Sequence, residues 1–173
     1  MSLSDAPLLF AFEIDSSEDF AYIPMIVRFH LDRGGLRISL DQWQLLPIED
    51  RKLLARFPAD VPVDPDMAAD RESPELSPGE VGFSQALAEM LRTHGCGEAE
   101  VFAPEPAPAW QSLGAPPAAL AAQCALAALP VPSLAQWAAL GGFERYVLAK
   151  LSRKPKLNHD FMPAMREFGL AGA

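Results

Sequence analysis

The spacing of apolar residues along the chain predicts a mainly helical protein. In most segments apolar side chains recur at intervals of three and four residues, which gives a helix one face to bury. The helices predicted in this way span residues 18–33, 40–45, 47–57, 80–93, 117–129, 134–139, 142–153 and 159–168. Residues 8–14 differ, because Leu8, Phe10 and Phe12 alternate with other positions and predict an extended segment or a short strand.

Residues that start and stop helices refine the boundaries of the first long helix. The acidic cluster Asp15, Glu18 and Asp19 suits the positive end of a helix and places its start near residue 18. Pro24 would then lie in or near the first turn, where its missing N–H is least costly. The glycine pair at 34–35 can adopt positive φ and is expected to end the helix.

Prolines divide the rest of the chain. They recur between residues 59 and 77 too often for a helix to propagate, so this segment is predicted to be a linker or an irregular arm. Pro104, Pro106 and Pro108 similarly predict an extended run that ends near Trp110.

Two segments, residues 39–57 and 133–151, share one pattern and predict an internal repeat. The shared positions pair Ser39 with Ser133, Leu40 with Leu134, Gln42 with Gln136, Trp43 with Trp137, Leu46 with Leu140, Arg51 with Arg145 and Leu54 with Leu148. Serine followed three residues later by glutamine is the pattern of a capping box. Because the same aromatic residue stands in both copies, we expect core packing at Trp43 and Trp137 in preference to a ligand-stacking pair.

The fold class predicted from these patterns is all-α. We expect one helical domain over residues 1–173, in which the two Trp-containing units pack as a pseudo-symmetric pair. The Pro-rich segments would connect the helices and wrap outside them.

The charge balance and the cysteine count narrow the function classes. A formal net charge of −9 repels phosphate polymers and anionic lipid surfaces, so neither nucleic acid nor membrane is an expected partner. The first 20 residues lack the basic region of a signal peptide, and no stretch reaches the about 20 apolar residues of a spanning helix. Two cysteines are too few for a disulfide framework, and a cytoplasmic protein is expected.

No residue cluster in the sequence predicts catalysis, a resident metal or a cofactor. His94 with Cys96, and His159 with Asp160, offer metal-ligand types, but a structural zinc site needs four ligands at recognisable spacing. The glycine pair at 34–35 is not followed by the Lys-Ser/Thr of a phosphate loop, and no GxSxG elbow occurs. A helix-turn-helix interpretation of the repeat conflicts with the net charge and with the Trp and Leu residues that each unit must bury.

Basic residues are the candidates for binding a partner. The set comprises Arg28, Arg145, Lys150, Arg153, Lys154 and Arg166. Helical arginines such as these could hold an anionic group, although they more often pair with nearby Asp and Glu. Lys150, Arg153, Lys154 and Lys156 form a basic patch in an acidic chain, which either steers an acidic partner surface or is a solvated helix end favoured by the dipole.

The sequence also resembles the nitrate reductase associated protein family. The residues that carry the resemblance are Phe10 to Glu13, Ile23 to Met25, Val27-Arg28, Leu31-Asp32, Leu40, Trp43, Pro108 to Trp110, Gln136-Trp137, Leu140, Glu144-Arg145, Leu148 to Arg153, Phe161, Pro163-Ala164 and Arg166 to Leu170. In the family a His-Glu-Asn run precedes an Asn-Phe or Asp-Phe pair, whereas the equivalent stretch of this chain is Leu157-Asn158-His159-Asp160-Phe161. Residues 59–95 match the family less well.

The resemblance implies an accessory protein, not an enzyme. Such proteins occur with nitrate-assimilation genes, so the implied partner is the apoenzyme of a cytoplasmic molybdenum nitrate reductase, whose maturation or stability this chain would assist. One alternative is a non-catalytic regulatory or structural interaction module in nitrogen metabolism. Another is a small-molecule sensor that uses the groove between the two repeat units.

Overall fold

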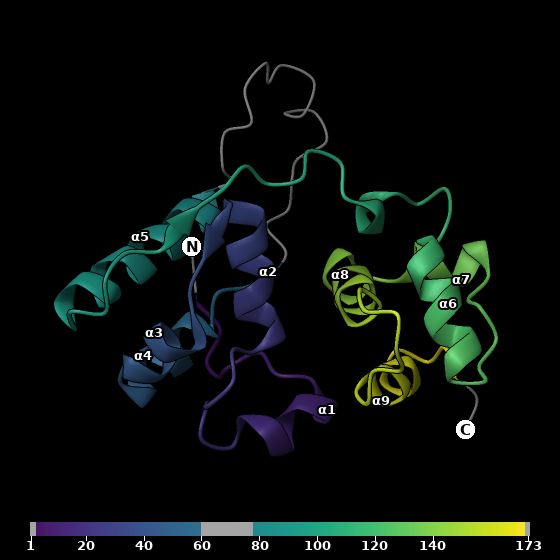
Figure 1. The fold of residues 1–173 in the computed structure, drawn as a ribbon, viewed down its shortest axis with the longest axis horizontal. Helices are drawn as coiled ribbons and strands as arrows, with labels where there is room; N and C mark the ends of the chain where they lie inside the picture. Colours follow the sequence, from purple (N-terminus) through teal and green to yellow (C-terminus); the bar gives the residue numbers. More distant parts are fainter. Residues whose placement is uncertain (1–2, 60–77, 172–173) are drawn as a thin grey trace. The chain divides into compact units, whose positions relative to one another are not determined.

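The computed structural model describes residues 3–59 and 78–171, and in them the fold is mainly helical, as predicted (Figure 1). The α-helices are α1 (Ala11–Ile14), α2 (Met25–Gly34), α3 (Leu40–Leu45), α4 (Ile48–Leu54), α5 (Pro78–Thr93), α6 (Ala118–Leu126), α7 (Leu134–Ala139), α8 (Gly142–Leu151) and α9 (Phe161–Glu167). Two 3-10 turns, η1 (Asp15–Ser17) and η3 (Ala109–Gln111), and two short strands, β1 (Leu36–Arg37) and β2 (Glu100–Val101), complete the described elements.

The chain forms two compact units. Unit 1 comprises Met1–Leu9 and Asp15–Pro104, and unit 2 comprises Phe10–Ile14 and Glu105–Ala173. The expectation of a single domain, with the two repeat segments packed as a pair, stays a prediction. Residues 60–77, which include most of the predicted linker, lie outside the described residues.

Unit 1 is built around helix α2. This helix lies beside α5, and α5 also contacts α4 (Figure 1). Strands β1 and β2 pair antiparallel, with Leu36 opposite Val101. The fully buried side chains Ile26, Trp43 and Phe83 form part of the core, so apolar burial joins helices that are well separated in the sequence.

Unit 2 is built around helix α8, which contacts η3, α6 and α9. Helix α1, although close to the N-terminus in sequence, belongs to this unit and contacts α9. Leu120 of α6, Trp137 of α7, Val147 of α8 and Phe161 of α9 are all fully buried. Helices α6, α7, α8 and α9 therefore all contribute fully buried apolar side chains to the core of this unit.

The predicted extended segment at residues 8–14 is wrong over Ala11–Ile14, which is helix α1. The Glu167 carboxylate accepts hydrogen bonds from the main-chain N–H groups of Ala11 (2.9 Å) and Phe12 (3.4 Å), which would otherwise lack partners at the start of a helix. The Phe10 ring stacks on Phe143, with centroids 5.0 Å apart. These long-range contacts favour a helical turn over the strand that the alternating pattern predicts.

The first long helix begins at Met25, so the start predicted near residue 18 is wrong. Pro24 is the N-cap in extended conformation (φ −63°, ψ 157°), and a residue preceding proline also disfavours the helical region. Upstream, Phe20 has φ 52°, a left-handed conformation that cannot continue a right-handed helix. Asp15 starts the 3-10 turn η1 instead.

The predicted end of this helix is confirmed. Gly35 has φ 65° and ψ 36°, and its N–H bonds to carbonyls of the last turn. A Cβ atom at this position would lie 2.3 Å from the carbonyl oxygen of Phe102. Gly35 is therefore required both for its backbone conformation and for the close approach of the segment after β2.

The short helices predicted at 40–45 and 134–139 are confirmed without a change of boundary, as α3 and α7. The other predicted helices exist but are mostly shorter, because their terminal residues adopt turns. The predicted helix at 117–129, for example, ends at Leu126, after which Ala128 has φ 54°.

Candidate functional site

The two segments predicted to be repeats have matching local structure, each within its own unit. The Ser39 side chain accepts from the Gln42 N–H (3.1 Å) while the Gln42 side chain accepts from the Ser39 N–H (2.9 Å). Ser133 and Gln136 make the same two bonds, at 3.2 and 2.9 Å. The capping boxes predicted from the sequence are therefore present in both helices.

Both tryptophans of these segments are core residues. Trp43 and Trp137 are 0% exposed, and each indole N–H donates to a main-chain carbonyl, of Phe20 (2.7 Å) and Ser112 (2.8 Å) respectively. A buried tryptophan with its polar N–H bonded is a stable arrangement that leaves no ring face for a ligand. The ligand-stacking alternative has no support in this geometry.

The arginine that follows each tryptophan bonds to main-chain carbonyls. Arg51 donates from Nε to Leu46 (3.0 Å) and from Nη1 to Phe20 (2.8 Å). Arg145 donates from Nε to the carbonyl of Trp110 (2.9 Å) and from Nη1 to that of Leu140. Each guanidinium thus connects its helix to an earlier segment of the same unit, Phe20 for Arg51 and η3 for Arg145.

Arg28 follows the same rule, because its Nε donates to the carbonyl of Ile23 (2.9 Å). The sequence favoured Asp and Glu as the partners of these helical arginines, whereas the bonds described for Arg28, Arg51 and Arg145 go to backbone oxygens. A planar guanidinium suits this task, since its several N–H groups can reach more than one carbonyl. Arg28 and Arg145 therefore have a visible structural role, and partner binding by them stays a prediction.

The candidate basic residues do not all belong to one unit. Arg28 lies in unit 1, whereas the other candidates lie in unit 2. Lys150 is half-buried on α8, with its Nζ 5.9 Å from the centroid of the Tyr146 ring. Arg166 is exposed on α9. Arg153 and Lys154 are exposed in the loop between α8 and α9.

We call residues 153–157, which carry Arg153, Lys154 and Lys156, the basic loop. Its backbone is held by Gln123 of α6, a glutamine that is only 1% exposed. The Gln123 Nε2 donates to the carbonyls of Lys154 (2.9 Å) and Lys156 (2.6 Å), and its Oε1 accepts from the Asn158 N–H (3.2 Å). One buried amide therefore fixes the backbone while the cationic side chains remain exposed.

Sequence reasoning missed Gln123. A glutamine within an Ala-rich helix carries no local signal for a partner more than 30 residues away. The available sign was weak: a long polar side chain on a helix whose neighbours Leu120 and Cys124 are apolar and, in the structure, fully buried. A buried side-chain amide must find partners, and here the loop supplies them.

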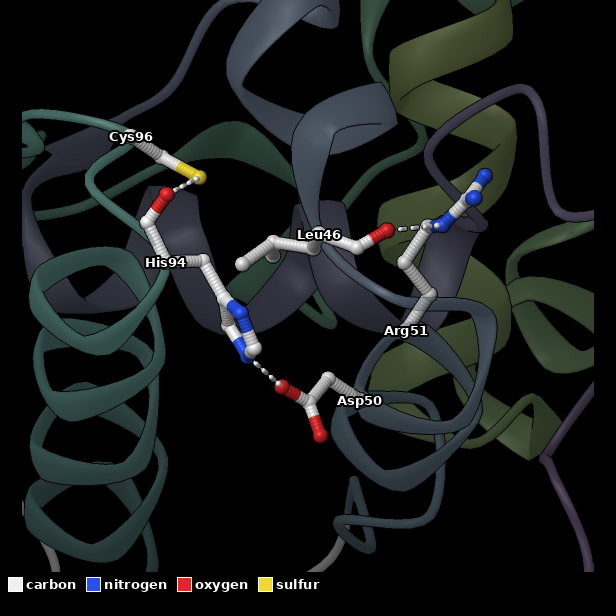
Figure 2. A network of polar contacts seen from close by, with 5 residues as sticks. All are labelled: Leu46, Asp50, Arg51, His94 and Cys96. Carbon is white, nitrogen blue, oxygen red and sulfur yellow. Dashed lines mark hydrogen bonds and ion pairs between the residues drawn. The ribbon is translucent and has the colours of Figure 1, made fainter.

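The sequence indicated His94 and Cys96 as a possible pair of metal ligands or reactive groups. In the structure, the His94 imidazole does not bond to the Cys96 thiol. Figure 2 shows the His94 ring directed at Asp50, with Nε2 2.8 Å from Oδ2, and the Cys96 thiol directed at the His94 carbonyl, 3.7 Å away. Figure 2 also shows Arg51 reaching the carbonyl of Leu46. The arrangement is a His–Asp hydrogen bond beside a weak thiol hydrogen bond, not a Cys–His nucleophile.

Other residues of the metal and nucleophile types are also dispersed. The His159 side chain is 91% exposed, and its Nε2 lies 3.2 Å from Oδ1 of the neighbouring Asp160. Burial raises the pKa of the Cys124 thiol above its ordinary value, which disfavours the reactive thiolate. In residues 3–59 and 78–171, no three His, Cys, Asp or Glu side chains gather closely enough to hold a metal ion.

Comparison with known proteins identifies a family that the chain resembles over most of its length. The family model described as conserved nitrate reductase-associated protein matches residues 9–168, which is most of the chain and includes parts of both units. No match is found among curated proteins or among solved structures. Among the described residues, no helix has the length and apolar character needed to cross a membrane.

Proposed function

Since the chain belongs to the conserved nitrate reductase-associated protein family, we propose that it is an accessory protein for an assimilatory nitrate reductase. In this proposal it binds a cytoplasmic, molybdenum-dependent reductase and assists its maturation or stability. The observation that carries the proposal is the family match, because it extends over residues 9–168 and so is not confined to one motif. Binding, not catalysis, is the proposed activity.

The same proposal covers the architecture of the repeat. We infer that residues 39–57 and 133–151 are two copies of one helical unit, since the capping box, the buried tryptophan and the carbonyl-bound arginine recur in both. In such a protein the copies act as rigid supports. The polar groups that recur in both copies, namely the capping Ser and Gln and the arginine, are bonded within the fold, which leaves recognition to other residues.

The candidate binding residues then differ in their role. Arg153 and Lys154, together with the half-buried Lys150 and the exposed Arg166, are the residues that we propose to meet the partner. Arg28 and Arg145 would act indirectly, by fixing the loops to which their guanidinium groups are bonded. A cationic surface on a chain of net charge −9 is suited to an acidic region of the reductase.

The test is a strain that lacks this gene, in which nitrate reductase activity, reductase polypeptide and reductase-bound molybdenum are measured in the same extracts. We expect abundant polypeptide with low activity and little bound metal if the protein acts in maturation. A reduced amount of polypeptide with normal activity per molecule would indicate a role in stability. Unchanged activity and unchanged polypeptide would contradict the proposal.

A second candidate is a non-catalytic regulatory or structural interaction module of nitrogen metabolism. It is favoured by the family's description, which states association with nitrate reductase and no step of cofactor loading. The same strain separates the candidates, because a regulator should change the response of the reductase to nitrogen source. A maturation factor should change the metal content for every nitrogen source on which the reductase is made.

A further inference from the structure

The basic loop of unit 2 has the properties of a prearranged docking surface. We propose that it binds an acidic protein segment which also carries apolar side chains, and that Gln123 is the positioning residue for this contact. The proposal rests on the function proposed above, because the acidic segment is assigned to the nitrate reductase polypeptide. It adds the surface, the chemistry of the partner segment and the residue that prepares the site.

The first observation is the rigidity of the loop backbone. Three hydrogen bonds from one buried side chain hold the carbonyls of Lys154 and Lys156 and the N–H of Asn158. The adjoining end of α8 is fixed too, since the buried Ser152 hydroxyl donates to the Leu148 carbonyl at 2.7 Å. A loop that is already ordered loses less conformational entropy on binding, which increases affinity.

The second observation is the chemistry that this backbone presents. Arg153, Lys154 and Lys156 are exposed. Within the described part of the chain, none of the three forms an ion pair with an acidic side chain. The other 11 basic residues of the chain are offset by its 23 acidic ones, so the loop is a local exception to the net charge. Such a local positive field attracts carboxylates during the approach of a partner.

The third observation is apolar surface at the same place. Leu157 lies between Lys156 and Asn158, two of the three residues whose backbone groups Gln123 binds, and it is 51% exposed. Leu126 is three residues from Gln123 on α6, hence adjacent on the helix surface, and it is 50% exposed. Gln123 therefore bonds to the backbone on both sides of one exposed leucine, Leu157, and lies one helical turn from a second exposed leucine, Leu126.

This combination selects the class of partner. Anionic lipid or nucleic acid would satisfy the cations, but the net charge of −9 opposes approach to any extended anionic polymer or surface. Exposed leucines beside cations instead match a protein interface, with an apolar centre and a charged rim. A segment with several Asp or Glu and one or two apolar residues is complementary to both features.

The experiment measures binding of the purified full-length chain to purified, cofactor-free nitrate reductase from the same organism. Lys154→Glu is compared with Arg92→Glu, which makes the same change of charge at an exposed position on α5 in unit 1. We expect Lys154→Glu to lower the association rate about tenfold at low salt, and less at high salt. We expect Arg92→Glu to leave the rate within about twofold.

Leu157→Ser tests the apolar contact of the proposed docking surface, and Gln123→Met tests the positioning role of Gln123. Leu157→Ser should weaken affinity about tenfold through faster dissociation, because an apolar contact is lost. Gln123→Met keeps the side-chain volume but removes every bond to the loop, so the Asn158 amide should exchange its hydrogen faster and affinity should fall. Circular dichroism of each variant checks that the fold is retained, and Gln123→Asn, whose shorter amide cannot reach all three backbone groups, replaces Gln123→Met if that variant unfolds.

The outcomes separate the two proposals. If the unaltered chain does not bind the reductase, the proposed function fails. If it binds, but Lys154→Glu and Arg92→Glu have equal effects, the docking surface is wrong while the function stands. Faster exchange at Asn158 with unchanged affinity would overturn the positioning role of Gln123. A membrane role would also overturn the proposal. It would be shown if the chain binds vesicles that contain phosphatidylserine, Lys154→Glu abolishes this binding, and changes in the basic loop leave reductase binding unaltered.

Discussion

The two repeat segments have the same local structure, but their Trp and Arg side chains bond to the rest of each unit in different ways. In unit 1, Trp43 and Arg51 both donate to one carbonyl, that of Phe20. In unit 2 the equivalent donors are divided, since Trp137 reaches Ser112 and Arg145 reaches Trp110. Phe20, which accepts two bonds, has a left-handed backbone conformation that costs about 1–2 kcal/mol outside glycine.

The glutamines of the two segments differ in the same way. Besides its capping bond, the Gln42 amide donates to the carbonyls of Cys96 (3.1 Å) and Glu98 (3.0 Å). In the described part of the chain, the side-chain hydrogen bond of Gln136 is the one in its capping box. Local capping is thus common to both copies, whereas attachment to a distant loop belongs to the first copy.

The largest effects are expected from removing the tryptophans. Trp43→Ala and Trp137→Ala should each lower the free energy of unfolding by about 3–5 kcal/mol, because both side chains are fully buried. Chemical denaturation measures the change, and hydrogen exchange shows which unit is affected. Lys154→Ala, an exposed change, should be nearly neutral. Similarly small effects at all three positions would contradict the equivalence of the two cores.

The arginines should give intermediate effects. Arg51→Lys and Arg145→Lys each remove a guanidinium that binds two or more carbonyls, and we expect a loss of about 1.5–3 kcal/mol of unfolding free energy. Arg92→Lys, at an exposed position, is the control and should change stability by less than about 0.5 kcal/mol. A near-zero effect at Arg145 with a full effect at Arg51 would show that only the first copy depends on this bond.

The smallest effect, and the sharpest comparison, concerns the glutamines. Gln136→Ala should cost about 0.5–1 kcal/mol of unfolding free energy, since it removes one capping bond. Gln42→Ala should cost about 1 kcal/mol more, because two further bonds to the loop at residues 96–98 are lost. Thermal unfolding followed by circular dichroism gives the difference. Equal losses would mean that the two extra bonds add nothing to stability.

Much of the candidate site could be predicted, but not its organisation. The cations Lys150, Arg153 and Lys154 are close together in an acidic sequence, so the order of residues alone indicates them. Their fixed backbone depends on Gln123, which is remote in sequence and has no local pattern. The carbonyl partners of Arg28 and Arg145 were likewise unpredictable, because any loop can supply a carbonyl.

What the sequence determined by itself is the set of local structures. Capping boxes at Ser39 and Ser133, the helical periods that follow them and the glycine stop at Gly35 depend on residues within a few positions of one another. Such short-range interactions have the same geometry in any tertiary setting, so the helices α3 and α7 were predicted at their observed boundaries.

Two conformations instead depend on partners that are distant in the sequence. Ala11–Ile14 became a helix because Glu167, more than 150 residues later, binds its first N–H groups. Phe20 adopted positive φ where Trp43 and Arg51 bind its carbonyl. In both places local propensity is weak and a few long-range hydrogen bonds, each worth about 1 kcal/mol, select the conformation.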